Sequence, residues 1–352
     1  MNNWNMYINQ MICIKCNNNL QSTLTLNSKC KTYDNSNITG ELICKNCGAK
    51  YPLYQDIPIV FKDDEITQTL LDKNKCKELS LSASQKMKLA SQVASDQLDK
   101  FKGTNEFQDA LSWELLFWDK WQTNGKENIE KILLEDEEGG GRLRFFDNIK
   151  KNCNLKNKIL LNIGAGKDRL LEKFINEGCF VIEQDIILES LLQLKLRGAN
   201  FCICCDARDI PLKNNFVNIS TSFEVLHHVY PINRPISELT RITKENIFFI
   251  EPNKFALTRF ALLFPPFVKN KFKRIFSNDY AHSPYEYSIN PLKFKKEIKL
   301  CHGNIIDFSY PKSTWIGKNS TGIKLLLRKL NLFILKILPI CSAHYYANVK
   351  LD

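Results

Sequence analysis

The stretch Ile159–Asp168 reads ILLNIGAGKD and joins a short apolar run to two glycines. The run has the composition of a buried strand, and the apolar residues after it recur at the spacing of an amphipathic helix. Gly164 and Gly166 let the backbone turn tightly and approach a ligand, because no Cβ stands in the way. The stretch therefore predicts a strand, a glycine loop and a helix, although alone it is weak evidence for any one ligand.

Two acidic residues end the next two apolar runs. Asp185 closes the run FVIEQD, nineteen residues after Gly166, and a carboxylate there can accept hydrogen bonds from both hydroxyls of a ribose. Asp206 and Ala207 close the third run, where an acid can accept from an adenine amino group and the next backbone amide can meet a ring nitrogen. The first acid fits a dinucleotide or an adenosyl ligand, whereas the second favours the adenosyl ligand.

Short apolar runs alternate with amphipathic segments between residues 158 and 253. Such alternation is typical of strand-helix-strand units around a parallel sheet. We expect strands at 158–163, 179–184, 201–205, 217–222 and 247–250.

The order and spacing of these blocks resemble the class I S-adenosylmethionine-dependent methyltransferases, particularly the subgroup similar to ubiquinone and menaquinone biosynthesis enzymes. The resemblance covers about 143–253 and includes FVNISTSFEVLHHV at 216–229 and EPN at 251–253. It implies an α/β fold with a Rossmann-like, mostly parallel sheet of seven strands. The last two strands, expected at 304–310 and 343–350, would form its antiparallel edge.

The resemblance also implies the residues that bind S-adenosylmethionine. Gly164 and Gly166 would line its methionine part, Asp185 its ribose, Asp206 and Ala207 its adenine, and Phe223 and Glu224 would face the methyl donor.

Two positions depart from the family pattern. Asn162 replaces the acid that usually precedes the glycine loop, and Asp168 stands at the third glycine position. Asn162 can still accept a hydrogen bond through its amide oxygen, but the ammonium group of the cofactor would lose a charge-assisted contact. Asp168 could restore that charge. A non-catalytic, adenosyl-binding scaffold is the alternative that these departures leave open.

Methyl transfer depends on proximity and on exclusion of water, and it needs a base only if the acceptor must lose a proton. We expect a hydroxyl acceptor on a glycan, a lipid-linked intermediate or a small metabolite. His227, His228 and His282 are the candidate proton acceptors, with a structural, hydrogen-bonded role as the alternative.

Four cysteines near the start have metal-ligand spacing, as Cys13-x-x-Cys16 and Cys44-x-x-Cys47. Four thiolates suit tetrahedral zinc with no open position for catalysis, so the metal would be structural. A redox pair or an iron site is the alternative. The longer pattern through Phe61 resembles the zinc-ribbon family that serves as activator subunit for tRNA and protein methyltransferases.

These segments predict a zinc ribbon at 1–61, a partly helical linker at 62–142 and a methyltransferase domain at 143–352, with insertions at 254–300 and 318–341. Within the linker, an apolar stripe from Phe107 to Trp118 predicts a docking helix.

The net charge of +11 is concentrated near the end, because residues 254–352 hold 17 Lys and Arg against 5 Asp and Glu. This basic third could meet a membrane surface, a phosphorylated substrate or nucleic acid, or simply be solvated. The leucine-rich segment 323–338 could be an interfacial helix or a buried one. RNA binding, and hence an RNA methyltransferase, remains an alternative.

No secretory leader is visible in the polar first ten residues, and the longest apolar stretch near the end, Leu330–Ala343, is too short for a membrane span. Thirteen cysteines then read as reduced thiols. We expect a cytoplasmic protein, with peripheral contact to the inner membrane face as a further option.

Overall fold

The computed structural model describes residues 7–15, 24–26, 38–62, 141–229, 231–255, 289–311, 322–342 and 344–351. The expected linker at 62–142, with its docking helix, lies almost entirely outside these ranges.

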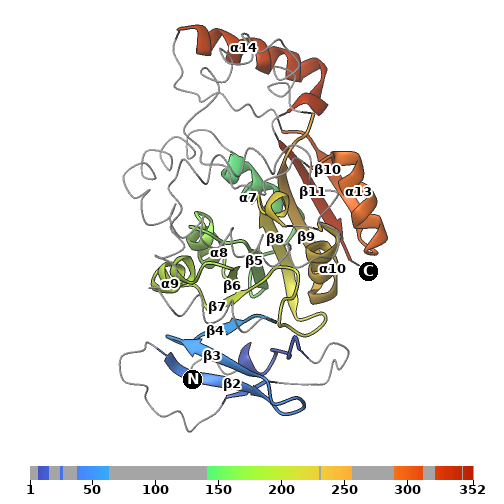
Figure 1. The fold of residues 1–352 in the computed structure, drawn as a ribbon. Helices are drawn as coiled ribbons and strands as arrows, with labels where there is room; N and C mark the ends of the chain where they lie inside the picture. Colours follow the sequence, from blue (N-terminus) through green and yellow to red (C-terminus); the bar gives the residue numbers. More distant parts are fainter. Residues whose placement is uncertain are drawn as a thin grey trace, which may run out of the picture.

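Seven strands form the sheet expected of the domain, in the order β7-β6-β5-β8-β9-β11-β10 (Figure 1). Neighbours from β7 to β9 pair in parallel, whereas β11 is antiparallel to both β9 and β10. The predicted fold class is therefore confirmed. The strands are β5 (Ile159–Ile163), β6 (Phe180–Asp185), β7 (Phe201–Cys205), β8 (Val217–Phe223), β9 (Thr243–Pro252), β10 (Asn304–Ser309) and β11 (His344–Lys350).

The strand order reverses at β5, which has β6 on one side and β8 on the other. In a parallel sheet, ligands bind at the carboxyl ends of the strands beside such a reversal. The register pairs Ile163 with Gln184, so the glycine loop leaves β5 directly beside Asp185 at the end of β6.

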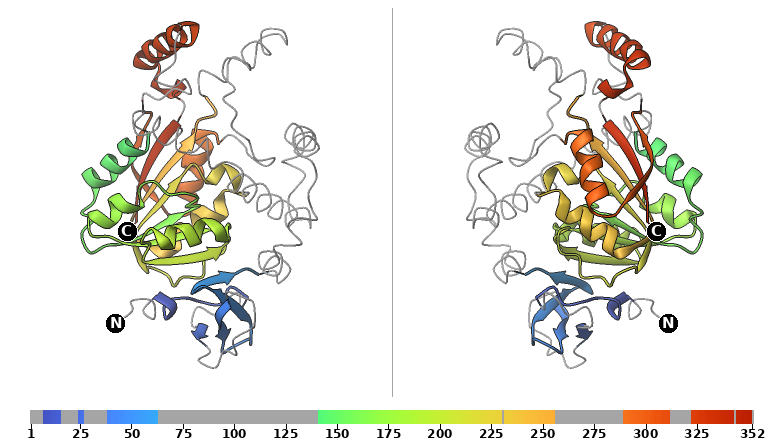
Figure 2. Two further views of the ribbon diagram at one scale, coloured as in Figure 1. Left: turned by 90° about the vertical axis from the view of Figure 1, so that its left-hand side faces the viewer. Right: turned by 90° about the vertical axis from the view of Figure 1, so that its right-hand side faces the viewer.

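Helices cover both faces of this sheet (Figure 2). Leucine, isoleucine and phenylalanine side chains from α7 (Gly141–Asn152), α8 (Leu171–Asn176) and α9 (Leu188–Leu196) fill the core on one face. On the other face, α10 (Asn233–Ile242) and α13 (Pro291–Leu300) supply the core. Thus α13, inside the expected insertion at 254–300, packs against the sheet through Phe294 and Ile298.

The N-terminal strands continue the same sheet. The strands β1 (Leu24–Leu26), β2 (Ile38–Cys44), β3 (Lys50–Tyr54) and β4 (Ile57–Val60) pair antiparallel in sequence order. The strand β4 then pairs in parallel with β7, which makes one sheet of 11 strands. The ring of Tyr7 also stacks on Phe201 of β7, with centroids 5.3 Å apart.

The expected strands agree with the structure to within one or two residues, except β9. This strand begins at Thr243, four residues before the predicted start, and ends at Pro252. Its first residues, Thr-Lys-Glu-Asn, lack the apolar signal, yet Asn246 already pairs with Lys350 of β11. Thr243 also pairs with Val217 of β8, so pairing with both neighbouring strands lengthens β9 beyond its apolar part.

The helix α14 (Gly322–Ile337) and the short turn η3 (Pro339–Cys341) precede β11. In the views of Figures 1 and 2, α14 lies at the end of the molecule opposite the N-terminal strands. None of the helices in the described ranges combines the length and apolar character needed to cross a membrane.

Candidate active site

Asp185 is held against the glycine loop by backbone hydrogen bonds. Its Oδ2 accepts from Gly166 N at 2.7 Å, and its Oδ1 accepts from Ile187 N at 2.8 Å. The side chain is buried, and burial raises the pKa of its carboxyl, although the backbone N–H groups oppose that shift. A carboxylate has about four acceptor positions, so these backbone amides do not use all of them, as ribose recognition would require.

The loop itself requires glycine at its first position. Gly164 has φ +57°, and a Cβ there would lie 2.5 Å from both γ carbons of Val225. The side-chain Oε1 of Gln184 accepts from Gly164 N at 3.2 Å, and the backbone carbonyl of Gln184 accepts from Ala165 N at 2.9 Å. Gly166 also has a positive φ, of +53°, but a Cβ there would meet no atom closer than 3.9 Å. The loop is therefore held by hydrogen bonds to Gln184 of β6 and packs against Val225, which follows β8.

Both polar atoms of the Asn162 side chain are already used inside the sheet. Its amide oxygen accepts from Thr221 Oγ1 at 3.0 Å, and its amide nitrogen donates to Glu183 Oε2 at 3.0 Å. One lone pair of the amide oxygen remains for a cofactor ammonium group.

Asp168 and Glu183 form a buried carboxyl pair next to Asn162. Asp168 Oδ1 accepts from Leu170 N at 2.7 Å, whereas Asp168 Oδ2 and Glu183 Oε1 are buried and accept no hydrogen bond from an N–H or O–H group of the described residues. Burial raises the pKa of both groups, and the pKa of Glu183, further raised by Asp168, lies well above its usual value. The negative charge of Asp168 disfavours ionisation of the Glu183 carboxyl, which therefore binds a proton more tightly than an isolated glutamate does. Asp168 thus contacts an acid that the sequence analysis did not single out.

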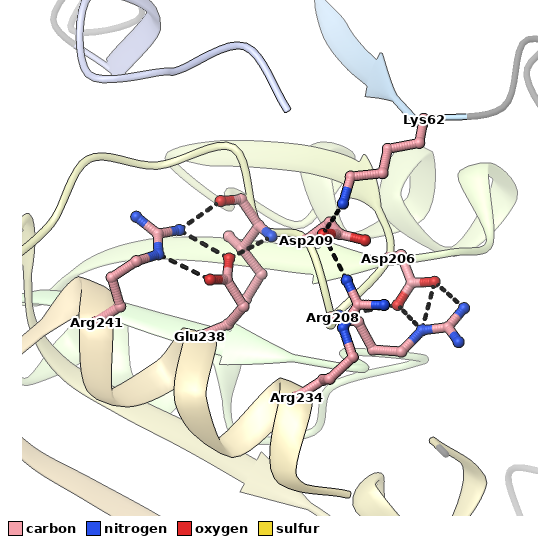
Figure 3. Close-up of polar contacts among 8 residues, drawn as sticks. Lys62, Asp206, Arg208, Asp209, Arg234, Glu238 and Arg241 are labelled. Carbon is pink, nitrogen blue, oxygen red and sulfur yellow. Dashed lines mark hydrogen bonds and ion pairs between the residues drawn. The ribbon is translucent and has the colours of Figure 1, made fainter. Parts of the chain in front are cut away.

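At the end of β7, Asp206 is paired with Arg208. Arg208 Nε lies 2.9 Å from both carboxylate oxygens, and Arg208 N donates to Oδ1 at 2.8 Å (Figure 3). Burial alone would raise the pKa of Asp206, but the guanidinium outweighs it and lowers that pKa below its usual value. The carboxylate is therefore ionised beside the buried Ala207, where the adenine is expected.

A second set of ion pairs fixes the loop after Asp206. Figure 3 shows Asp209 between Lys62, just after β4, and Arg234 of α10, at 2.5 Å and 3.0 Å. Glu238 of α10 accepts from Ile210 N at 2.8 Å and pairs with Arg241 at 2.7 Å. The segment that would contact the adenine is thereby connected to both the N-terminal strands and α10.

Glu224 directly follows β8, whereas Phe223, expected just past the strand, is its last residue. The Phe223 ring packs edge-on against Phe145, and the Arg142 guanidinium lies 4.5 Å from its centroid. Glu224 adopts φ +56° and its Oε1 lies 2.5 Å from Nε2 of His344, the first residue of β11. Burial raises the pKa of Glu224, but His344 and Arg142 outweigh it and bring that pKa to about 2. Sequence analysis missed His344, because its position beside Glu224 depends on the pairing of β11 with β9.

Glu251 at the end of β9 holds the histidine turn η1 (Leu226–His228) in place. Its Oε1 accepts from Val225 N at 3.1 Å and from Leu226 N at 2.8 Å, and its Oε2 lies 2.9 Å from His227 Nδ1. The side chains of Glu251 and His227 are buried, and the ring centroids of His227 and His228 lie 4.0 Å apart. The third candidate, His282, lies outside the described residues.

Three of the four expected metal ligands lie together. The sulfur atoms of Cys13, Cys44 and Cys47 all lie within 4.8 Å of one another, and Cys13 Sγ is 3.6 Å from Cys47 Sγ. Zinc–sulfur bonds of about 2.3 Å in a tetrahedron place the sulfurs about 3.8 Å apart, so the geometry fits zinc. The Tyr51 hydroxyl lies 3.3 Å from Cys13 Sγ and can support that ligand. Cys16 lies outside the described residues.

Comparison with known families identifies the central region. Residues 161–250 match the family described as a methyltransferase domain. This range contains all the cofactor candidates, together with His227 and His228. No curated protein matches the chain significantly.

Several solved structures resemble the chain at low sequence identity. A complex of the Haloferax volcanii methyltransferase activator with a methyltransferase has a TM-score of 0.47 and 8% identity, over 67% of this chain and 97% of that one. Magnesium protoporphyrin IX methyltransferase from Synechocystis, with bound S-adenosylhomocysteine, has a TM-score of 0.44 and 14% identity, over 66% and 97%. Phosphoethanolamine N-methyltransferase 2 from Haemonchus contortus has a TM-score of 0.43 and 14% identity, over 68% and 59%.

Proposed function

The chain contains a methyltransferase domain over residues 161–250, and we propose that it binds S-adenosylmethionine across the carboxyl ends of β5, β6 and β7. The observation that carries this proposal is the contact of Asp185 with the amide of Gly166. It places a carboxylate against a glycine loop at the point where the strand order reverses. The hydroxyl groups of a ribose bound there would donate to the carboxylate oxygens of Asp185, and the backbone of the loop would lie beside the ribose.

The other cofactor contacts follow from the neighbouring strands. The ionised Asp206 and the amide of Ala207 would bind the adenine, and Gly164 and Gly166 the methionine part. The ammonium group would meet Asn162 and the Asp168–Glu183 pair. The raised pKa of Glu183 favours its protonated form, so the negative charge at this place would come mainly from Asp168, which would replace the acid that the family usually has at Asn162.

We further propose a hydroxyl acceptor with His227 as the proton acceptor. The acceptor oxygen would bond to the methyl carbon as the carbon–sulfur bond breaks, S-adenosylhomocysteine would leave, and the hydroxyl proton would pass to His227 Nε2. Glu251 supports this role because it accepts from Nδ1 and thereby fixes the tautomer with Nε2 unprotonated. Glu251 is thus a positioning residue.

The cysteine cluster is proposed as a structural zinc site, completed by Cys16. Its place in the β1–β4 unit, away from the carboxyl ends of β5 and β6, fits a metal that stabilises the N-terminal unit rather than one that takes part in transfer.

Titration calorimetry with S-adenosylhomocysteine tests the cofactor site. Asp185→Ala and Asp206→Ala should each weaken binding by about 1.5–3 kcal/mol, which is typical of a lost hydrogen bond to a charged group. Asp147→Ala removes an exposed aspartate of α7 and serves as the matched control, with unchanged affinity. Tight binding of a nicotinamide dinucleotide, or equal affinity in all variants, would refute the proposal.

A further inference from the structure

The outer side of α14 carries a stripe of exposed apolar side chains. Leu326, Leu330, Phe333 and Ile337 are 68%, 53%, 59% and 66% exposed. Steps of four, three and four residues place all four on one side of a helix. Leu335, by contrast, is fully buried and points to the opposite side, at about 100° per residue. The stripe is therefore not the face by which α14 packs on its own chain.

The positive charge of this segment indicates an anionic partner. The helix contains Lys324, Arg328, Lys329 and Lys336, and no acidic residue occurs from 308 to 351. Lys329 and Lys336 are exposed, and each directly precedes a stripe residue, so both lie on the same flank of the stripe. An apolar stripe flanked by lysines is the pattern of helices that lie in the surface of an anionic bilayer, where long lysine side chains can reach the headgroups. A second copy of the chain would bring like charges together.

The attachment of α14 also places the stripe near the candidate active site. Asn253, just after β9, donates to the carbonyls of Ile340 and Ser342 at 2.7 Å and 2.9 Å. His344 follows directly and contacts Glu224. A surface that receives α14 would therefore lie on the side of the sheet where the parallel strands end (Figure 1).

We propose that α14 docks on an anionic membrane surface, with Leu326, Leu330, Phe333 and Ile337 inserted among the lipids and Lys329 and Lys336 at the headgroups. The docking does not depend on the proposed methyl transfer, but it would bring the candidate active site towards acceptors held in that membrane.

Co-sedimentation of the full chain with vesicles tests this docking. Phosphatidylcholine vesicles containing phosphatidylglycerol should bind the chain, whereas pure phosphatidylcholine should bind it more weakly, and added salt should weaken only the anionic component. Leu330→Gln with Phe333→Gln should reduce binding about tenfold or more for each side chain, since each loses most of its apolar transfer energy. Glutamine keeps a good helix propensity, so the helix itself should persist.

Matched controls separate the stripe from general surface effects. Leu196→Gln alters an apolar side chain at the end of α9 that is also highly exposed, and should bind vesicles like the wild type. Lys329→Gln with Lys336→Gln should reduce binding about fivefold per charge. Lys151→Gln with Lys156→Gln, an equal change of charge at other exposed positions, should reduce it much less.

Three results would overturn the docking. The first is that the wild type binds no vesicle at low salt, and the second is that the Leu330 and Phe333 changes leave binding unchanged. The third is that sedimentation velocity finds a dimer which those changes dissociate, because a second copy would then cover the stripe. Calorimetry with S-adenosylhomocysteine on the same variants measures the cofactor site independently of vesicle binding. Failure of the docking proposal would therefore not be mistaken for failure of the proposed function, or the reverse.

Discussion

Asp168 and Glu183 are the residues that, under the proposed cofactor site, would compensate for the acid missing at Asn162. Asn162 leaves the middle of the site without the charge that the family usually has there, and two carboxyl groups lie beside it. Burial and Asp168 raise the pKa of Glu183, which favours its neutral form and so reduces the repulsion between the two groups. Sequence analysis predicted that Asp168 could restore the charge, but it did not single out Glu183, which lies beside Gln184 and Asp185 in the polar second half of β6.

The Glu183→Gln substitution should change how stability depends on pH. Burial first, and Asp168 second, hold the folded-state pKa of Glu183 well above 4.5. At pH values between 4.5, the usual pKa, and the raised pKa of the folded state, Glu183 is protonated in the folded state but ionised in the unfolded state. The wild type therefore loses stability as pH rises through this interval, by about 1.4 kcal/mol per pH unit. Glutamine imitates the protonated acid and lacks this loss. Urea unfolding across that pH interval should therefore find the variant increasingly more stable than the wild type.

Glu189→Gln, which alters a half-buried glutamate of α9, provides the control and should follow the pH profile of the wild type. Parallel profiles for Glu183→Gln and the wild type would show that the pair does not hold an extra proton.

At the scale of elements, the β5–loop–α8 unit was the most predictable part of the chain. A buried strand, two glycines and an amphipathic helix are each encoded locally, and the structure has all three at the predicted positions. The contact that makes Gly164 necessary is not local, because Val225 lies after β8 and reaches the loop only in the folded sheet.

The substitution Gly164→Ala should be costly for two reasons. Alanine at φ +57° is strained by about 1–2 kcal/mol, and its Cβ would overlap the γ carbons of Val225, which adds about 1–3 kcal/mol of overpacking. Urea unfolding should show both losses. Gly166→Ala has nearly the same φ but open space around its Cβ, so it should show the strain alone.

A double variant isolates the packing component. Val225→Ala removes both γ carbons, so Gly164→Ala in that background should cost less than it does in the wild type. Equal costs in the two backgrounds would exclude the contact with Val225 as the cause.

The contacts that sequence analysis missed share one property. Arg208 beside Asp206, Glu251 beside His227 and His344 beside Glu224 are charged or polar partners whose meeting depends on how the chain turns and pairs. Glu224 and His344 are 120 residues apart. Apolar periodicity reports where strands and helices form, but it contains no information about such pairings.

At the scale of the whole molecule, the N-terminal unit is an extension of the central sheet. The sequence predicted a separate ribbon at 1–61, and nothing in its pattern indicated that β4 would pair with β7. In the structure, Ile59 and Val60 pair with Cys204 and Cys205, directly before Asp206. The backbone of Ile12 also donates to the carbonyl of Pro211 at 2.9 Å. Any loosening of the N-terminal unit should therefore reach the edge of the strand that leads to the adenine site.

Zinc removal provides the test of that connection. The purified chain should contain about one zinc, and Cys44→Ser should lose it, as elemental analysis would show. A chelator should then destabilise the β1–β4 unit, because a zinc ion at the cysteine cluster would link Cys13 to the turn between β2 and β3. Hydrogen exchange should become faster in β4 and at the β7 amides that face it, whereas β10 and β11, at the other end of the sheet, should keep their protection.

Two comparisons make this result specific to the metal and to the shared sheet. The chelator should change nothing further in Cys44→Ser, since that variant already lacks the ion. Faster exchange in β2 and β3 without any change in β7 would mean that the two units unfold independently despite their pairing. Faster exchange in β10 and β11 as well would mean that the whole sheet unfolds as one cooperative unit when the metal leaves. Only a change that reaches β7 and stops short of β11 would show that the N-terminal unit supports the strand that leads to Asp206 and not the sheet as a whole.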